Sequence, residues 1–180
     1  MGQPRSAPDA ALVVGMLSAW PELFERARAR LTGRFGPVAR VSGVMDFDFT
    51  DYYTAEMGAG LKRAFLAFAE PFDAGLLAET KVWTNALERE FAAPERPVPR
   101  PVNLDPGYLD PLRLVLATTK DFPHRVYLGQ GIYAEVTLQY ARGDFEPMPW
   151  TYRDYRTPAY REFFRSVRAD LLARRRRADD

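Results

Sequence analysis

Cysteine is absent from this sequence of 180 residues. No disulfide, thiolate metal site or cysteine nucleophile can therefore form. The sequence also has no apolar run near the roughly 20 residues that a helix needs to cross a bilayer. Its first nine residues lack the charged, apolar and small-residue regions of a secretory signal. Together these absences predict a cytoplasmic protein without a membrane anchor.

A marked excess of charge of either sign is also missing, since 25 basic and 24 acidic residues give a net charge of +1. A long-range field that attracts nucleic acid or anionic lipid is therefore not expected, and any anion site must be local. The one charge block is the arginine run at residues 174–177. We interpret it as a solvated helix end rather than a nucleic-acid tail, because basic residues suit a helix C-terminus.

Lysine and histidine are scarce, with only Lys62, Lys81, Lys120 and His124. Arginine supplies the other basic residues, as under a GC-rich coding bias. A lysine that survives such a bias can mark a place that needs a compact ammonium group, and chance survival is the alternative. Several standard motifs are missing too, namely G-x-x-x-x-G-K-[ST], G-x-G-x-x-G, G-x-S-x-G and H-E-x-x-H. The common NTPase, dinucleotide, serine-hydrolase and zincin functions have no support.

The length favours one domain over residues 11–173, with a disordered leader at 1–10 and a charged tail at 174–180. Apolar spacing predicts a strand at 12–18 and a helix that begins at Pro21 and stops at Gly33. A long strand at 38–49 and extended segments at 52–57 and 61–68 follow, and the frequent alanine at 61–68 leaves a helix there as the alternative.

The second half predicts a helix at 74–92, a type II turn at residues 105–108 (Asp-Pro-Gly-Tyr), and a final helix that opens at Pro158. Between the turn and the last helix, the strands 112–119, 125–128 and 132–140 form a meander with a tight hairpin at 129–131. This pattern predicts a single α+β domain. We expect a mainly antiparallel sheet with three helices, in which a ferredoxin-like core is extended by a C-terminal β-meander and helix.

Polar side chains gather in the middle of the chain. On the predicted helix one stripe carries Lys81, Thr84, Asn85 and Glu88, which could hold a phosphate or sugar or only solubilise the helix. On the meander, a polar strand face carries Arg125, Tyr127 and Glu135, and it is either a ligand face or a solvated one.

A strand end brings Thr119, Lys120, His124 and Arg125 together, a composition suited to an anion pocket. His124 is the candidate catalytic residue, as a base or as a hydrogen-bond donor to phosphate, and a purely structural role is the alternative. Asp46 and Asp48 share the face of a predicted strand, as Mg²⁺ ligands can.

Several short motifs occur in order along the chain, among them Asp51-Tyr52-Tyr53, Asn103-Leu104-Asp105-Pro106-Gly107-Tyr108, His124-Arg125-Val126-Tyr127-Leu128 and Trp150-Thr151-Tyr152. With the motifs around them, they resemble the DUF4416 family, a bacterial domain of unknown function, over about residues 12–170. The resemblance implies a single-domain bacterial protein with a common site in its middle region. It transfers no reaction and no catalytic residues.

Three functions stay open from the sequence. The first is a site for a small phosphate-bearing or nucleotide-like molecule, with Tyr108 to stack on it and the carboxylates of Asp105 and Glu135 to orient polar groups. The second is a metal-dependent hydrolase or transferase that uses Mg²⁺ or Mn²⁺ at Asp46 and Asp48. The third is a non-catalytic protein or RNA interaction module around residues 150–156, which are rich in Tyr and Arg.

Overall fold

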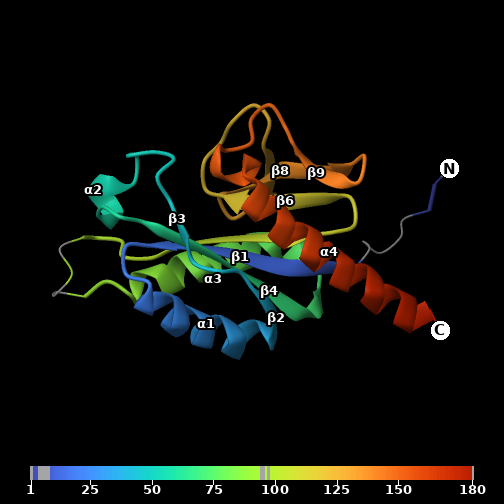
Figure 1. Ribbon diagram of the computed structural model, residues 1–180, viewed down its shortest axis with the longest axis horizontal. Helices are drawn as coiled ribbons and strands as arrows, with labels where there is room; N and C mark the ends of the chain where they lie inside the picture. The colour runs from blue at the N-terminus through green and yellow to red at the C-terminus, as the bar shows by residue number, and fades with distance from the viewer. Residues whose placement is uncertain (1, 4–8, 94–95, 97, 180) are drawn as a thin grey trace.

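A computed structural model describes residues 2–3, 9–93, 96 and 98–179. Within them the strands form a nine-stranded sheet in the order β2-β4-β1-β5-β6-β8-β7, with β3 paired to β4 and β9 to β8 (Figure 1). Every ladder is antiparallel. The strands are β1 (Ala10–Ser18), β2 (Val38–Val41), β3 (Met45–Asp46), β4 (Lys62–Phe72), β5 (Asn103–Leu109), β6 (Arg113–Thr118), β7 (Val126–Gly129), β8 (Ile132–Ala141) and β9 (Asp144–Pro147).

The helices of the described residues are α1 (Glu22–Phe35), α2 (Thr54–Met57), α3 (Leu77–Arg89) and α4 (Pro158–Asp179), with short 3₁₀ turns η1 (Ala74–Leu76) and η2 (Asp154–Arg156). The α+β class and the mostly antiparallel sheet are confirmed. The expected number of helices is one too low, because α2 is a single turn inside a segment predicted as extended. None of the helices in this part of the chain is long and apolar enough to cross a membrane.

Helices cover both faces of the sheet, and the alternation along β1 shows which helix covers which face. Leu12, Val14 and Met16 pack in one core cluster with residues of α1 and α3. Ala11 and Val13 pack in another with the aromatic stripe of α4. Because strand residues alternate between faces, β1 is buried along its whole length. Figure 1 shows α1 and α3 together below the strands, with α4 crossing in front of them.

The strand expected at residues 38–49 is broken into β2 and β3. At the break, Ser42 pairs with Phe65 of β4 through its own N–H and through its side-chain Oγ, which accepts the Phe65 N–H at 2.8 Å. The side chain thus replaces a main-chain acceptor, and the backbone leaves the sheet at residues 43–44.

The stop expected at Gly33 is also displaced. Gly33 lies inside α1, and the helix ends at Gly36, whose φ of 82° lies in the left-handed region and whose N–H donates to the Thr32 carbonyl. Both glycines fit a helix-stop pattern, but only the second follows Phe35, the last residue of the helix, which packs against the core.

The arginine run at residues 174–177 belongs to α4 and does not form a separate tail. Arg174 donates to the carbonyls of Ala69 and Ala10, and Arg175 donates to that of Asp9. The run therefore begins against the ends of β1 and β4, and only Arg176 and Arg177 are exposed as expected. Most of the predicted leader, residues 1 and 4–8, lies outside the described residues, and Ala10 already belongs to β1.

The expected meander and its hairpin at residues 129–131 are present, with positive φ at all three turn residues. Strand β9 is not among the elements predicted from the sequence. It pairs with the end of β8 across the turn Arg142-Gly143, where φ is also positive at both residues.

Candidate functional site

Residues 105–108 continue β5, so the predicted type II turn is wrong. The pairing of β5 with β1 runs through this segment without a break. Glycine is needed at position 107 because β5 and β6 lie close together there, and not because the chain turns. A Cβ atom on Gly107 would lie 2.4 Å from the main-chain oxygen of Val115 in β6. Proline and glycine that would favour a turn locally are held extended between two neighbouring strands.

Pro106 explains why β5 and β6 then separate. Their ladder ends at the pair Gly107–Leu116, and the same register would next set Pro106 opposite Ala117. Alternate residues of a strand direct their N–H and C=O groups to the same side. Leu104 directs both groups away from β1, so Pro106 faces that side too and has no N–H to offer. β6 leaves β5 at this point and continues beside β8.

A cavity of about 900 Å³ opens where the two strands part. Its wall includes α3, β5, the end of β6, the segment that carries α2, and the loop before α4. The volume lies within the usual range of small-molecule sites, which is about 300–1,000 Å³.

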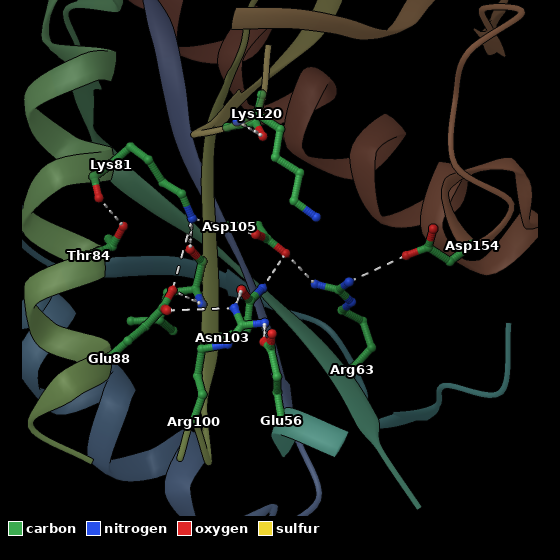
Figure 2. Close-up of polar contacts among 12 residues, drawn as sticks. Glu56, Arg63, Lys81, Thr84, Glu88, Arg100, Asn103, Asp105, Lys120 and Asp154 are labelled. Atoms are coloured by element: carbon green, nitrogen blue, oxygen red, sulfur yellow. Dashed lines mark hydrogen bonds and ion pairs between the residues drawn. The ribbon is translucent and has the colours of Figure 1, made fainter. Parts of the chain in front are cut away.

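Two side chains of α3 take the place of the missing strand beside Leu104. Glu88 accepts the Leu104 N–H at 2.7 Å, and the ammonium group of Lys81 donates to the Leu104 carbonyl at 2.7 Å. Both side chains are buried, with Nζ and Oε1 4.0 Å apart (Figure 2). Their seven-residue spacing puts them on one face of the helix, which is the stripe that the sequence indicates.

Arg63 of β4 holds the other side of Asp105. Its guanidinium group crosses β1 above Gly15 and donates to Asp105 at 3.1 Å and to Asp154 of η2 at 3.4 Å (Figure 2). Gly15 makes this crossing possible, because a Cβ there would lie 3.1 Å from Nη1 of Arg63. The buried cation is therefore compensated by carboxylates from two distant parts of the chain.

The pKa values of the carboxylates in this network are shifted in different directions. Burial by itself would raise the pKa of Asp105, but the charges of Lys81 and Arg63 outweigh burial and hold the pKa below its ordinary value. Burial raises the pKa of Glu88, and the attraction of Lys81 offsets only part of that rise. Burial likewise raises the pKa of Asp154 despite the nearby Arg63. Asp105 is thus the most firmly ionised carboxylate of the three.

Arg100 ties the α2 segment to the cavity. It donates to Glu56 at 2.7 Å and to Asn103 at 2.5 Å, and its guanidinium group lies 5.8 Å from the ring centre of Tyr53. Burial raises the pKa of Tyr53 to about 12, so this hydroxyl stays protonated at neutral pH.

Three cations of the cavity wall have no carboxylate within ion-pair distance among the described residues: Arg89, Lys120 and Arg153. The ammonium group of Lys120 instead donates to the Tyr52 hydroxyl at 2.9 Å and lies 4.5 Å from the centre of that ring. All three side chains belong to exposed residues, so uncompensated positive charge lies at the mouth.

Glu135 fastens the loop between β6 and β7. Its Oε2 accepts from Arg125 at 2.8 Å and lies 3.0 Å from Nε2 of His124. Arg125 in turn donates to the Lys120 carbonyl and the Tyr152 hydroxyl. The His124 ring stacks on Trp150, with ring centres 4.8 Å apart. His124 therefore holds Glu135 from outside the cavity wall.

The candidate residues from the sequence fall into two groups. The cavity wall contains Lys81, Asn85, Glu88, Asp105, Thr119, Lys120, Arg125 and Glu135. Outside it lie Asp46, Asp48, Thr84, Tyr108, His124 and Tyr127.

The outer group has other contacts. The Thr84 hydroxyl donates to the Lys81 carbonyl within α3, and Tyr108 packs between two core clusters under the sheet. Tyr127 is exposed beside Tyr133. Asp46 forms an ion pair with Lys62, and Asp48 is exposed. In the described chain, His, Asp and Glu nowhere form a group of three that could hold a metal ion.

The interaction hypothesis depends on residues 150–156. Several of their side chains already form hydrogen bonds within the protein. Trp150 donates its indole N–H to the Val136 carbonyl, and Arg156 donates to the carbonyls of Thr151 and Pro149. Tyr152 remains half exposed and lines the cavity.

Arg63, Arg100 and Asp154 line the cavity but are not among the site residues predicted from the sequence. The sequence does carry one signal for Arg63. Apart from Lys62 and Arg63, residues 61–69 are all apolar, so a charged side chain lies in a segment expected to be buried. Such a charge needs a buried partner. Its partners Asp105 and Asp154 are 42 and 91 residues away in sequence, so no local pattern identifies them.

Comparison with known proteins gives one family. No curated protein and no solved structure matches this chain. The family described as "Domain of unknown function (DUF4416)" matches residues 8–171, which include every residue of the cavity wall. The chain therefore belongs to the DUF4416 family.

Proposed function

We propose that the protein binds a small phosphate-bearing or nucleotide-like molecule in the cavity between β5 and β6. The observation that carries this proposal is the distribution of charge. The cations in the depth of the cavity, Lys81 and Arg63, lie beside carboxylates, whereas Arg89, Lys120 and Arg153 at the mouth have none within reach among the described residues. Unpaired ammonium and guanidinium groups are the donors that phosphate oxygens prefer.

Aromatic side chains support a ligand that contains a ring. Phe49, Tyr52 and Tyr53 line the cavity on one side, and Tyr152 and Tyr155 line it on another. Aromatic rings stack on nucleobases and pack against sugar faces. A cavity of this volume accommodates a mononucleotide or a phosphorylated sugar.

Titration calorimetry on the full chain tests the proposal, with mononucleotides, sugar phosphates and inorganic phosphate as probes. We expect Lys120→Ala to raise the dissociation constant of a bound phosphorylated probe about tenfold, because a hydrogen bond to a charged group is lost. Lys62→Ala is the matched control, since Lys62 pairs with Asp46 outside the cavity wall. Equal affinities for the two variants and the parent chain would contradict the proposal.

The metal-dependent alternative depends on Asp46 and Asp48, which lie outside the cavity wall, and the interaction alternative depends on side chains that largely bond internally. We therefore do not propose either.

We also infer a ferredoxin-like core in a single domain over residues 11–173. The succession β1-α1-β2-β4-α3-β5 with the order β2-β4-β1-β5 supports it, since each neighbouring pair is antiparallel and both connecting helices pack on one face.

A further inference from the structure

A buried ammonium group and a carboxylate oxygen face each other across the cavity floor without a hydrogen bond. Nζ of Lys81 lies 3.7 Å from Oδ1 of Asp105 and 4.0 Å from Oε1 of Glu88, and both distances exceed a hydrogen bond. Its hydrogen bond to the Leu104 carbonyl uses only one of its three N–H groups.

Asp105 is open on the side that faces Lys81. Its other oxygen, Oδ2, accepts from both Arg63 and Asn103, at 3.1 and 2.7 Å. Its side chain is 27% exposed, compared with 4% for Arg63 and 7% for Lys81. Because Asp105 lines the cavity, that exposed part is open to a ligand. Figure 2 shows Lys81 and Asp105 close together, with the side chain of Lys120 reaching down from the end of β6.

The chemistry of this gap selects a hydroxyl group. A phosphate there would gain Lys81 but would lie against Asp105 and Glu88, and an ammonium group would lie against Lys81 and Arg63. A hydroxyl group accepts from an ammonium and donates to a carboxylate at the same time. Asn85 lies one helical turn beyond Lys81 on the cavity wall, and its amide offers the same pair of functions to a second hydroxyl.

We infer that the ligand is a phosphorylated sugar or a nucleotide that binds with its sugar hydroxyls at Lys81 and Asp105 and its phosphate at the mouth. The inference rests on the proposed function and adds the substrate class and the orientation. The phosphate then meets Lys120 and Arg153, whose charges are not compensated by the described carboxylates, and the hydroxyls meet the compensated network on the floor.

Pairs of probes that differ by one hydroxyl test the inference on the unaltered protein. Calorimetry would compare ribose 5-phosphate with 2-deoxyribose 5-phosphate, and adenosine 5′-monophosphate with its 2′-deoxy and 3′-deoxy analogues. We expect loss of a hydroxyl that reaches the floor to weaken binding about tenfold in at least one pair, because the ammonium and the carboxylate each lose a hydrogen bond.

Three variants separate the two ends of the ligand. Asn85→Ala and Asp105→Asn should bring the affinity ratio of hydroxyl to deoxy probe toward one, whereas Lys120→Ala should weaken both probes by the same factor. Asn85→Ala keeps the test valid if Asp105→Asn proves unstable, since no hydrogen bond within the described chain depends on the Asn85 amide.

The outcomes distinguish failure of this inference from failure of the proposed function. Phosphorylated probes that bind through Lys120 with no difference between hydroxyl and deoxy members would overturn this inference and leave the proposed function standing. Inorganic phosphate that binds as tightly as ribose 5-phosphate would do the same. If no phosphorylated probe binds, both proposals are wrong.

Discussion

At the scale of single residues, Asp105 and Glu88 share the same ammonium group but differ in their other neighbours. Asp105 receives hydrogen bonds from Arg63 and Asn103 as well as the charge of Lys81. Glu88 is more deeply buried and accepts the main-chain N–H of Leu104. The charges of Lys81 and Arg63 outweigh burial at Asp105, so its pKa is lowered. At Glu88, Lys81 and Arg100 offset only part of the effect of burial and the charge of Asp105 opposes them, so its pKa is raised.

We predict opposite effects for the two neutral isosteres at pH 7. Asp105→Asn should lower the free energy of unfolding by about 1–3 kcal/mol, less than the loss from a fully buried pair because the carboxylate is partly open. Glu88→Gln should raise the melting temperature, since the amide oxygen keeps the Leu104 hydrogen bond and the desolvated charge is gone. Thermal unfolding of both variants and the parent chain measures this.

The pH dependence provides the check on sign. A lowered folded-state pKa means that Asp105 stabilises the fold above its ordinary value near 4, and this stability is lost as pH falls through the lowered value. A raised folded-state pKa means that ionised Glu88 destabilises the fold at neutral pH, and the penalty disappears as pH falls toward the ordinary value for glutamate, about 4.3. The advantage of Glu88→Gln should therefore vanish near pH 4. An advantage that persists there would show that ionisation is not its cause.

At the scale of the element, β5 determines where the site lies. Gly107 lets β5 approach β6, and Pro106 ends their ladder one residue earlier in the chain. One dipeptide thus both joins the two strands and opens the gap between them. Side chains from α3 then satisfy the exposed edge of β5 at Leu104 and become part of the cavity floor.

Substitution of glycine by alanine should have opposite effects in β5 and α1. Gly107→Ala places a Cβ 2.4 Å from the Val115 carbonyl oxygen, so we expect a loss of about 1–3 kcal/mol or more in unfolding free energy. Gly33→Ala meets no atom within 4 Å and should gain about 0.5–1 kcal/mol, because alanine favours a helix interior. Chemical denaturation of both variants decides the point, and a stable Gly107→Ala protein would refute the close approach of the two strands.

At the scale of the whole molecule, the sheet joins both halves of the chain through β1. This strand contacts β4 and β5 on its two edges, α1 and α3 through one face, and α4 through the other. The far end of α4 returns to the beginning of β1, where Arg174 donates to the carbonyls of Ala10 and Ala69. The C-terminal helix is therefore fixed at both ends of its packing surface.

Arginine substitutions along α4 test this closure. Arg174→Ala should cost about 1–3 kcal/mol of unfolding free energy, since a charged donor to two main-chain carbonyls is lost. Arg177→Ala is the matched control, because Arg177 is exposed and such positions usually change stability by less than about 0.5 kcal/mol. Urea denaturation curves of the two variants give the comparison. Equal stabilities would mean that the end of α4 is only a solvated tail.

Much of the local structure follows from the sequence. Helix stripes, the glycines of the hairpin at residues 129–131 and the face shared by Lys81, Asn85 and Glu88 all depend on neighbours within a few residues. The gathering of polar residues in the middle of the chain was also visible, and most of the candidate residues there line one cavity. Their role in binding stays a prediction.

The sequence by itself determined the class of fold and several helices and strands, because short-range periodicity and turn chemistry depend on adjacent residues. Only the tertiary structure decided that Asp105-Pro106-Gly107 runs straight, since β1 and β6 hold it from outside the segment. It also decided that Arg63 meets Asp105 and Asp154, which are 42 and 91 residues away. A cavity floor built from such distant partners depends on how strands and helices pack, and no local pattern records that.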